Sequence, residues 1–235
     1  AKQASADIVK EWANKLINTS LHVYSKQDHN EIVKGGANLR KKLKEINTRM
    51  YGYGLEELTS NDTMFAQNGY KEIVAEIAMG KTNIPNNYSY LNILSSSLAS
   101  DGIWNNPNYS QDLPEHIVSR MKHTVEQVIS KGFSYNSMVR VLDIWQELKK
   151  PPIGLLSCTG SVFIFAFLLK EYADGSYYKR DINTNGGSLN YKDLCNLIYA
   201  VVKELPKAKD QFIVKQTPEH ASFCQLTGEI FKISK

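Results

Sequence analysis

The run VFIFAFLL at residues 162–169 decides how the rest of this chain can fold. Every residue in it is apolar, so a helix formed from it would be apolar on all sides and would have to be buried. The run continues into KEYA at residues 170–173, and the combined length favours a helix, although the β-branched and aromatic residues leave a strand open. The whole apolar stretch, 153–169, is shorter than the roughly 20 residues of a membrane-spanning helix. We therefore predict a buried helix at the centre of the C-terminal half.

Around this run, apolar residues recur at three- and four-residue spacing, which is typical of amphipathic helices. The segments with this pattern are residues 5–24, 30–50, 70–79, 90–98, 114–132, 134–150 and 189–205. Asp112, Pro114 and Glu115 have the chemistry of a helix start, and Gly132 that of a helix end. The tail is ambiguous, because residues 213–214 fit a short strand and residues 219–230 fit a helix. The sequence thus predicts an all-α protein of about eight to ten helices.

A change of composition suggests how these helices are grouped. Residues 81–114 are rich in Asn, Ser, Gly and Pro, apart from an apolar patch at residues 90–98. Long polar loops of this kind are common where two lobes meet. We predict an N-terminal helical lobe at residues 1–110 and a C-terminal helical lobe at residues 111–235.

The bulk composition limits the class of protein. The 235 residues include 28 basic and 24 acidic side chains, and the resulting charge of +4 permits a polyanionic partner without requiring one. Three cysteines without paired spacing argue against a disulfide framework and for buried free thiols. The first residues lack a hydrophobic signal region. We expect a cytoplasmic or virion protein that is not inserted in a membrane.

Catalytic and cofactor-binding signatures are not found in the sequence. It contains no G-x-S-x-G elbow, no phosphate-binding G-x-x-x-x-G-K-[ST] loop and no C-x-x-C pair. The cysteines also lack the local signature of a thiol protease. We therefore predict that the protein is not an enzyme, with no catalytic residue, no metal and no cofactor.

One loop resembles the opening of a calcium-binding EF-hand. DINTNG at residues 181–186 alternates oxygen-bearing side chains and ends in glycine, as such loops do. The closing glutamate, however, would fall at Lys192, and Asp193 replaces it only if the loop has one extra residue. The alternatives are a weak calcium site at residues 181–193 and an ordinary Asn-Gly surface loop.

Basic and aromatic residues give the leading functional hypothesis. They recur in both halves of the chain and few acidic residues interrupt them, a pattern typical of sequence-tolerant RNA binding. The candidate residues are Arg40, Lys41, Lys44, Arg49, Arg120, Lys122, Tyr177, Tyr178, Lys179 and Arg180. In this hypothesis the cations neutralise phosphates in a groove between the lobes, and Tyr177 and Tyr178 stack on bases from a mobile loop.

The hypothesis describes a self-assembling RNA-coating protein, by analogy of size, helicity and basic clusters with viral nucleocapsid and filament coat proteins. The N-terminal helix, through Trp12 and Leu16, or the C-terminal tail would dock on a neighbouring subunit to form an oligomer or filament. Two alternatives stay open. One is a helical protein-interaction module or effector, and the other is a calcium-responsive helical protein that uses the 181–193 loop.

Overall fold

The computed structural model divides the chain into two compact units, Ala1–Gly52 and Tyr53–Lys235. It describes residues 15, 20–23, 31–59, 62–65, 71–174, 176–180, 185–215, 219, 222–223, 226–227 and 230. The sequence predicted a lobe boundary at residue 110. Leu98 and Val118, on either side of that position, belong to one hydrophobic core within the second unit.

The first unit contains a short hairpin followed by a basic helix. Strands β1 (Ser20–Val23) and β2 (Glu31–Lys34) pair antiparallel, and α2 (Gly36–Met50) follows. Gly35 joins β2 to α2 with a positive φ of 82°, a conformation that glycine adopts without strain. The predicted helix at 30–50 is therefore confirmed from Gly36 onwards. Trp12 and Leu16, which were expected to dock on a neighbouring subunit, lie outside the described residues.

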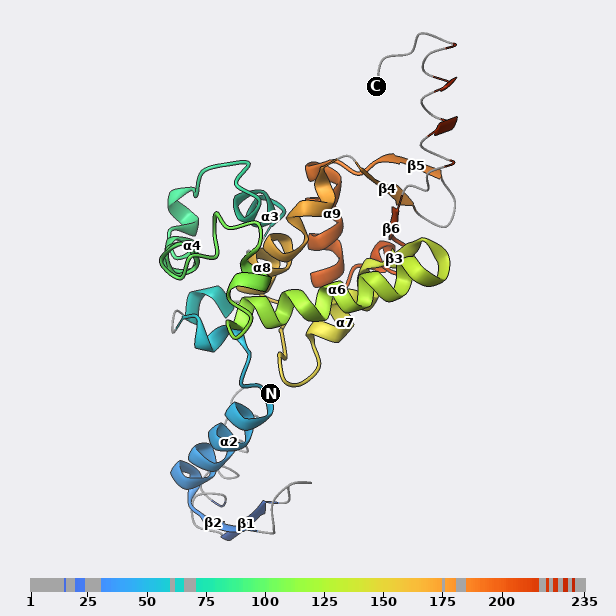
Figure 1. Cartoon of the computed structure of the whole chain (residues 1–235). Coiled ribbons are helices and arrows are strands. Elements are labelled where there is room, and N and C mark those ends of the chain that lie inside the picture. Colours follow the sequence, from blue (N-terminus) through green and yellow to red (C-terminus); the bar gives the residue numbers. More distant parts are fainter. Residues whose placement is uncertain are drawn as a thin grey trace, which may run out of the picture. The chain divides into compact units, whose positions relative to one another are not determined.

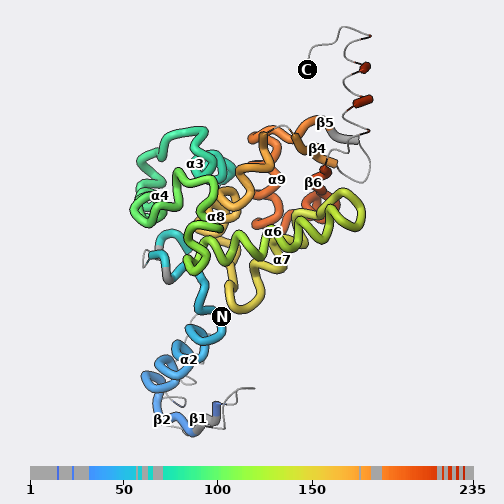
Figure 2. The backbone as a smooth tube through the Cα atoms, in the orientation of Figure 1, coloured from blue at the N-terminus to red at the C-terminus, as the bar shows by residue number. Residues whose placement is uncertain are grey.

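The second unit is built around α8 (Thr159–Leu169), in which every residue is buried. This confirms the central helix predicted from the apolar run. Helices α3 (Ile73–Ala78) and α9 (Tyr191–Val202) contact α8 and each other, although more than a hundred residues separate them in sequence. Figure 1 and the tube trace in Figure 2 show these segments side by side.

In the part of the second unit that the structure describes, four further α-helices and five short 3-10 turns surround this centre. The α-helices are α4 (Leu91–Ser100), α5 (Tyr109–Asp112), α6 (Ile117–Asn136) and α7 (Val141–Leu148). The 3-10 turns are η1 (Leu55–Glu57), η2 (Asp62–Phe65), η3 (Asn86–Tyr88), η4 (Lys170–Ala173) and η5 (Pro206–Ala208).

Both predicted ends of the long helix α6 are wrong. Asp112 ends α5, and the N-cap of α6 is His116, whose Nδ1 accepts a hydrogen bond from the Val118 N–H at 3.2 Å. At the other end the helix continues past Gly132 to Asn136, and Ser137 ends it in the left-handed conformation. Gly132 instead allows close packing, because a Cβ at this position would lie 2.8 Å from the Met138 carbonyl oxygen.

A four-stranded antiparallel sheet overturns the predicted all-α fold. Its strands are β3 (Met138–Arg140), β4 (Tyr177–Arg180), β5 (Asn185–Ser188) and β6 (Phe212–Lys215), in the order β3-β6-β4-β5. It lies beside the C-terminal end of α6 (Figure 1). The described chain is therefore mixed α and β. Strands of three or four residues are too short to show an alternating pattern of apolar side chains. The sequence therefore predicted none of these strands, apart from the possible short strand at residues 213–214.

Candidate nucleic-acid interface

Three of the predicted phosphate-binding residues lie together on α2. Arg40, Lys41 and Lys44 are all exposed, and the helical rise of 1.5 Å per residue places Arg40 and Lys44 about 6 Å apart along the helix axis. The one acidic residue of α2, Glu45, lies on the adjacent side, where its carboxylate is 3.9 Å from Lys42 Nζ. One side of this helix thus presents a row of cations.

A basic hollow of about 260 Å³ adjoins this row, between β2 and α2. It is lined by Ile32, Val33, Lys34, Asn38, Lys41, Lys42 and Glu45. Lys34 is exposed, and its carbonyl oxygen accepts a hydrogen bond from Asn38 Nδ2 at 2.8 Å. Lys41 lines the hollow and also belongs to the exposed row, so the two basic surfaces are continuous.

The positive charge of the protein is concentrated in the first unit. Residues 1–52 contain 10 of the 28 basic and 5 of the 24 acidic residues, which gives this unit a net charge of +5. Residues 53–235 carry the remaining 18 basic and 19 acidic residues, a net charge of −1. The first unit therefore has the more positive electrostatic potential of the two.

The two predicted phosphate ligands on α6 already have partners. Arg120 forms an ion pair with Glu115, and its guanidinium stacks 4.6 Å from the centre of the Tyr53 ring. Lys122 is buried, and its ammonium donates to the Leu168 carbonyl at 3.0 Å and to Glu171 Oε1 at 2.6 Å.

A signal for the burial of Lys122 was present in the sequence. This residue follows Val118 by four positions and precedes Val125 by three, and both valines are buried. Helical spacing therefore assigns Lys122 to the apolar side of α6. The phosphate-binding prediction grouped Lys122 with other basic residues and did not take this spacing into account.

The aromatic and basic residues at 177–180 form strand β4 rather than a mobile loop. The Tyr177 ring stacks on Phe133 with 5.9 Å between ring centres and meets Tyr172 edge-on at 5.0 Å. Burial raises the pKa of the Tyr177 hydroxyl, and the nearby carboxylates of Asp174 and Glu171 raise it further.

The remaining members of this predicted cluster are placed differently from one another. Lys179 Nζ lies 2.6 Å from Asp193 Oδ1, Tyr178 is half-buried with contacts of its own, and Arg180 is exposed at the end of the strand. Arg49 of α2 is exposed and also has an interaction within the protein. Arg180 is thus the cation of β4 most open to an external phosphate.

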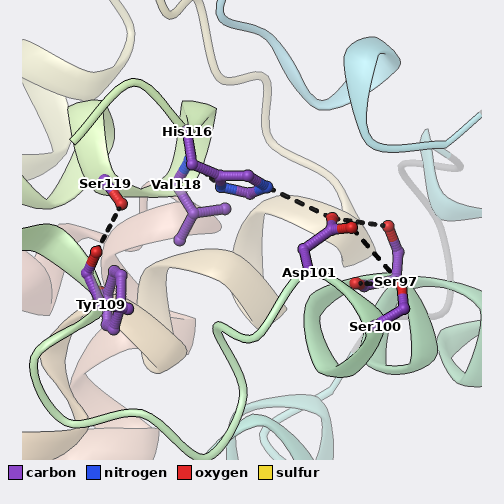
Figure 3. Close-up of polar contacts among 7 residues, drawn as sticks. All are labelled: Ser97, Ser100, Asp101, Tyr109, His116, Val118 and Ser119. Atoms are coloured by element: carbon purple, nitrogen blue, oxygen red, sulfur yellow. Dashed lines mark hydrogen bonds and ion pairs between the residues drawn. The ribbon is translucent and has the colours of Figure 1, made fainter. Parts of the chain in front are cut away.

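A serine, aspartate and histidine cluster that the sequence analysis did not identify joins α4 to the start of α6 (Figure 3). The Asp101 carboxylate is contacted by Ser97 Oγ at 3.5 Å, Ser100 Oγ at 3.4 Å and His116 Nε2 at 3.3 Å. An activated serine needs a hydrogen bond to its base. Here both hydroxyls face the carboxylate, and His116 Nδ1 is occupied by Val118 N–H. The arrangement fixes a helix start and lacks the geometry of a hydrolase.

The two described cysteines are buried and free, as expected. Burial raises the pKa of Cys195 to about 12, with a smaller contribution from Glu76, and burial also raises the pKa of Cys158. A thiol attacks as its thiolate, so neither residue is an activated nucleophile near neutral pH. Cys224 lies outside the described residues.

The predicted calcium loop is described only in part. Residues 181–184 lie outside the described residues, 185–188 form β5, and Asp193 is paired with Lys179. Within the described ranges, no three His, Cys, Asp or Glu side chains are grouped so that they could hold a metal ion. No helix in those ranges combines the length and apolar character needed to cross a membrane.

Comparison of the chain with protein families, curated proteins and solved structures finds no match.

Proposed function

We propose that this protein binds RNA with little sequence preference, as a non-enzymatic, self-associating protein of the nucleocapsid or coat type. The exposed cation row of Arg40, Lys41 and Lys44 on α2 is the observation that carries the proposal. Cations at this spacing neutralise consecutive phosphates, and such contacts do not depend on the base. The net charge of +5 on residues 1–52 acts in the same direction.

The proposal retains only part of the predicted residue set. Lys34, beside the hollow, joins the row on α2, and Arg180 is a further contact on the second unit. Lys122 is left out because its ammonium is buried and already holds two oxygen acceptors. Tyr177 is left out as a base-stacking residue because its ring is packed between two aromatic side chains.

Salt dependence and one triple variant test the proposal. Three phosphate contacts to a single strand give a slope of about −2 in log K against log salt, so affinity should fall about 20-fold between 50 and 200 mM salt. Fluorescence anisotropy with a short labelled single-stranded RNA measures this fall. Replacing Arg40, Lys41 and Lys44 by glutamine should remove most of the binding and flatten the salt dependence.

A matched control has the same change in charge elsewhere. Lys192, Lys207 and Lys209 are exposed on the second unit, and their replacement by glutamine should reduce affinity far less. Equal binding in the two salt concentrations would contradict phosphate contact. An equal loss in the control would show that only total charge matters, and the proposed interface on α2 would then be wrong.

The apolar edge of α2 favours a second candidate function, a protein-interaction module. Within the described residues no residue of α2 is buried, and Leu43 and Met50 are exposed on the side away from the cation row. A basic amphipathic helix of this kind also suits a groove on a protein partner. The 260/280 nm absorbance ratio of the purified protein separates the candidates, because a nucleic-acid-free monomer would favour the module.

A further inference from the structure

We propose that the basic hollow between β2 and α2 holds a nucleobase of the bound RNA and favours bases that carry an exocyclic amino group, cytosine over uracil in particular. The inference rests on the proposed RNA binding, because it names the part of the strand that enters this hollow. It predicts a modest base preference, added to an affinity that the phosphate contacts supply.

The hollow lies where a strand held by the cation row would pass. Its volume is about 260 Å³, and Lys41 belongs both to its lining and to the row on α2. Sites that enclose drug-sized ligands measure roughly 300–1,000 Å³, so this hollow suits a smaller group. A phosphate held by Lys41 brings a base of the same strand to the mouth of the hollow.

Hydrogen-bond donors and acceptors alternate along the wall of the hollow. Asn38, Lys41 and Glu45 follow one another at spacings of three and four residues, which places them on one side of α2. Lys34 precedes them at the end of β2. The two ammonium groups donate hydrogen bonds, whereas the Asn38 amide oxygen and the Glu45 carboxylate accept them. A wall of this composition matches a ligand that has both donors and acceptors.

Both acceptors in this wall are accessible to a ligand. Asn38 Nδ2 donates to the Lys34 carbonyl oxygen at 2.8 Å, which holds the amide in place and leaves its oxygen for another donor. The Glu45 side chain is 53% exposed, and its carboxylate lies 3.9 Å from Lys42 Nζ, beyond hydrogen-bond distance. Within the described part of the chain, neither Asn38 nor Glu45 has a further hydrogen bond or ion pair.

These acceptors favour a base over a phosphate group as the occupant. A phosphate diester offers only acceptor oxygens and a negative charge, so the Glu45 carboxylate would repel it. The edge of a nucleobase carries donors and acceptors side by side, and single-stranded RNA leaves that edge free. Asparagine and glutamate are among the side chains that pair with the amino groups of adenine and cytosine. Ile32, which is 58% exposed, adds an apolar surface against which the ring can lie.

Cytosine and uracil differ in the groups that this wall would distinguish. Cytosine presents an N4 amino group beside the N3 acceptor, and these match the Glu45 carboxylate and the Lys41 ammonium group, which are neighbours one helical turn apart. Uracil presents a carbonyl oxygen and an N–H at the same positions, so its oxygen would face the carboxylate. The mismatch costs uracil about one net hydrogen bond, which corresponds to about a fivefold difference in affinity.

Fluorescence anisotropy with labelled oligocytidylate and oligouridylate of equal length tests the preference, because the two strands carry the same charge. At one salt concentration the full-length wild type should bind the cytidine strand about fivefold more tightly. Glu45→Ala should bring the ratio of the two affinities close to one, because the acceptor for the amino group is lost. The matched control is Glu56→Ala, at an exposed residue outside the hollow, which makes the same change in charge and should keep the ratio.

The pattern of outcomes separates this inference from the proposed function. A preference for cytidine that Glu45→Ala removes and Glu56→Ala keeps supports the nucleobase site. Equal affinity of the wild type for the two strands, or a ratio that Glu45→Ala leaves unchanged, would overturn the site, and salt-dependent binding would still support RNA contact at the cation row. A gain in affinity for both strands by the same factor in Glu45→Ala would show that the hollow takes a phosphate instead. Absence of salt-dependent binding to either strand would reject the RNA function and the nucleobase site together.

Discussion

At the scale of single residues, the position of Lys122 follows from the burial of α8. The last carbonyl groups of any helix lack partners within the helix, and those of a fully buried helix cannot reach water. Lys122 Nζ supplies a donor to the Leu168 carbonyl, and its positive charge faces the negative end of the helix dipole. Glu171, which is half-exposed, and the ring of Tyr172 at 5.3 Å complete its surroundings. A residue predicted to bind phosphate thus has a structural role.

Lys122→Met should therefore lower the stability of the protein. Methionine fills a similar volume but leaves the Leu168 carbonyl without its donor, at a cost of about 2 kcal/mol. For a chain of this size the melting temperature should fall by about 4–8 °C. Lys150→Met is the control, because its exposed pair with Glu147 should contribute less than about 1 kcal/mol. Thermal melts followed by circular dichroism measure both, and equal losses in the two variants would contradict this role.

The residues of the candidate interface differ in how well the sequence could place them. Arg40, Lys41 and Lys44 occupy the polar side of an amphipathic helix, so their exposure follows from spacing alone. The environment of Tyr177 depends on Phe133, 44 positions earlier, and no local pattern connects the two residues. The pairing of Lys179 with Asp193 likewise joins two different elements, β4 and α9. Because the sheet was not predicted, contacts that depend on it could not be predicted either.

At the scale of elements, length separates what was predicted from what was missed. α8, α2 and α9 span 11, 15 and 12 residues, enough for three or more helical turns to repeat. The strands of the larger sheet have three or four residues, and β3 follows α6 with a single residue between them. Local spacing therefore assigned Val139 to a helix. What holds β3 in the sheet is its antiparallel pairing with β6, more than 70 residues later.

Gly132 gives a test of how closely α6 packs on β3. In an exposed helix, Gly→Ala stabilises by about 1 kcal/mol. Here the new methyl group would lie 2.8 Å from the Met138 carbonyl oxygen and 2.9 Å from Val139 Cβ, so Gly132→Ala should destabilise by about 1–3 kcal/mol. Gly187→Ala on β5 has no atom within 4 Å of the new methyl group and should be nearly neutral. Urea unfolding compares them, and a stabilised Gly132→Ala would show that β3 moves away without loss.

At the scale of the whole molecule, the hydrophobic core and the positive charge lie in different units. The core is made of residues from Tyr53–Lys235, whereas the net charge of +5 lies in Ala1–Gly52. The basic helix α2 has no buried residue and therefore contributes little to the stability of the fold. Substitutions of its exposed side chains should affect binding more than stability. The proposed RNA contact follows the same division, because the cation row lies on the first unit.

This division predicts the behaviour of a chain shortened to residues 53–235. The core is retained, so the fragment should unfold cooperatively with a melting temperature within a few degrees of that of the full chain. Its affinity for single-stranded RNA should fall at least as far as that of the triple glutamine variant, because the cation row is removed with the +5 charge. Melting and anisotropy of one preparation measure the two quantities together. Undiminished RNA binding by the fragment would move the interface to the second unit, where Arg180 would be the first residue to test.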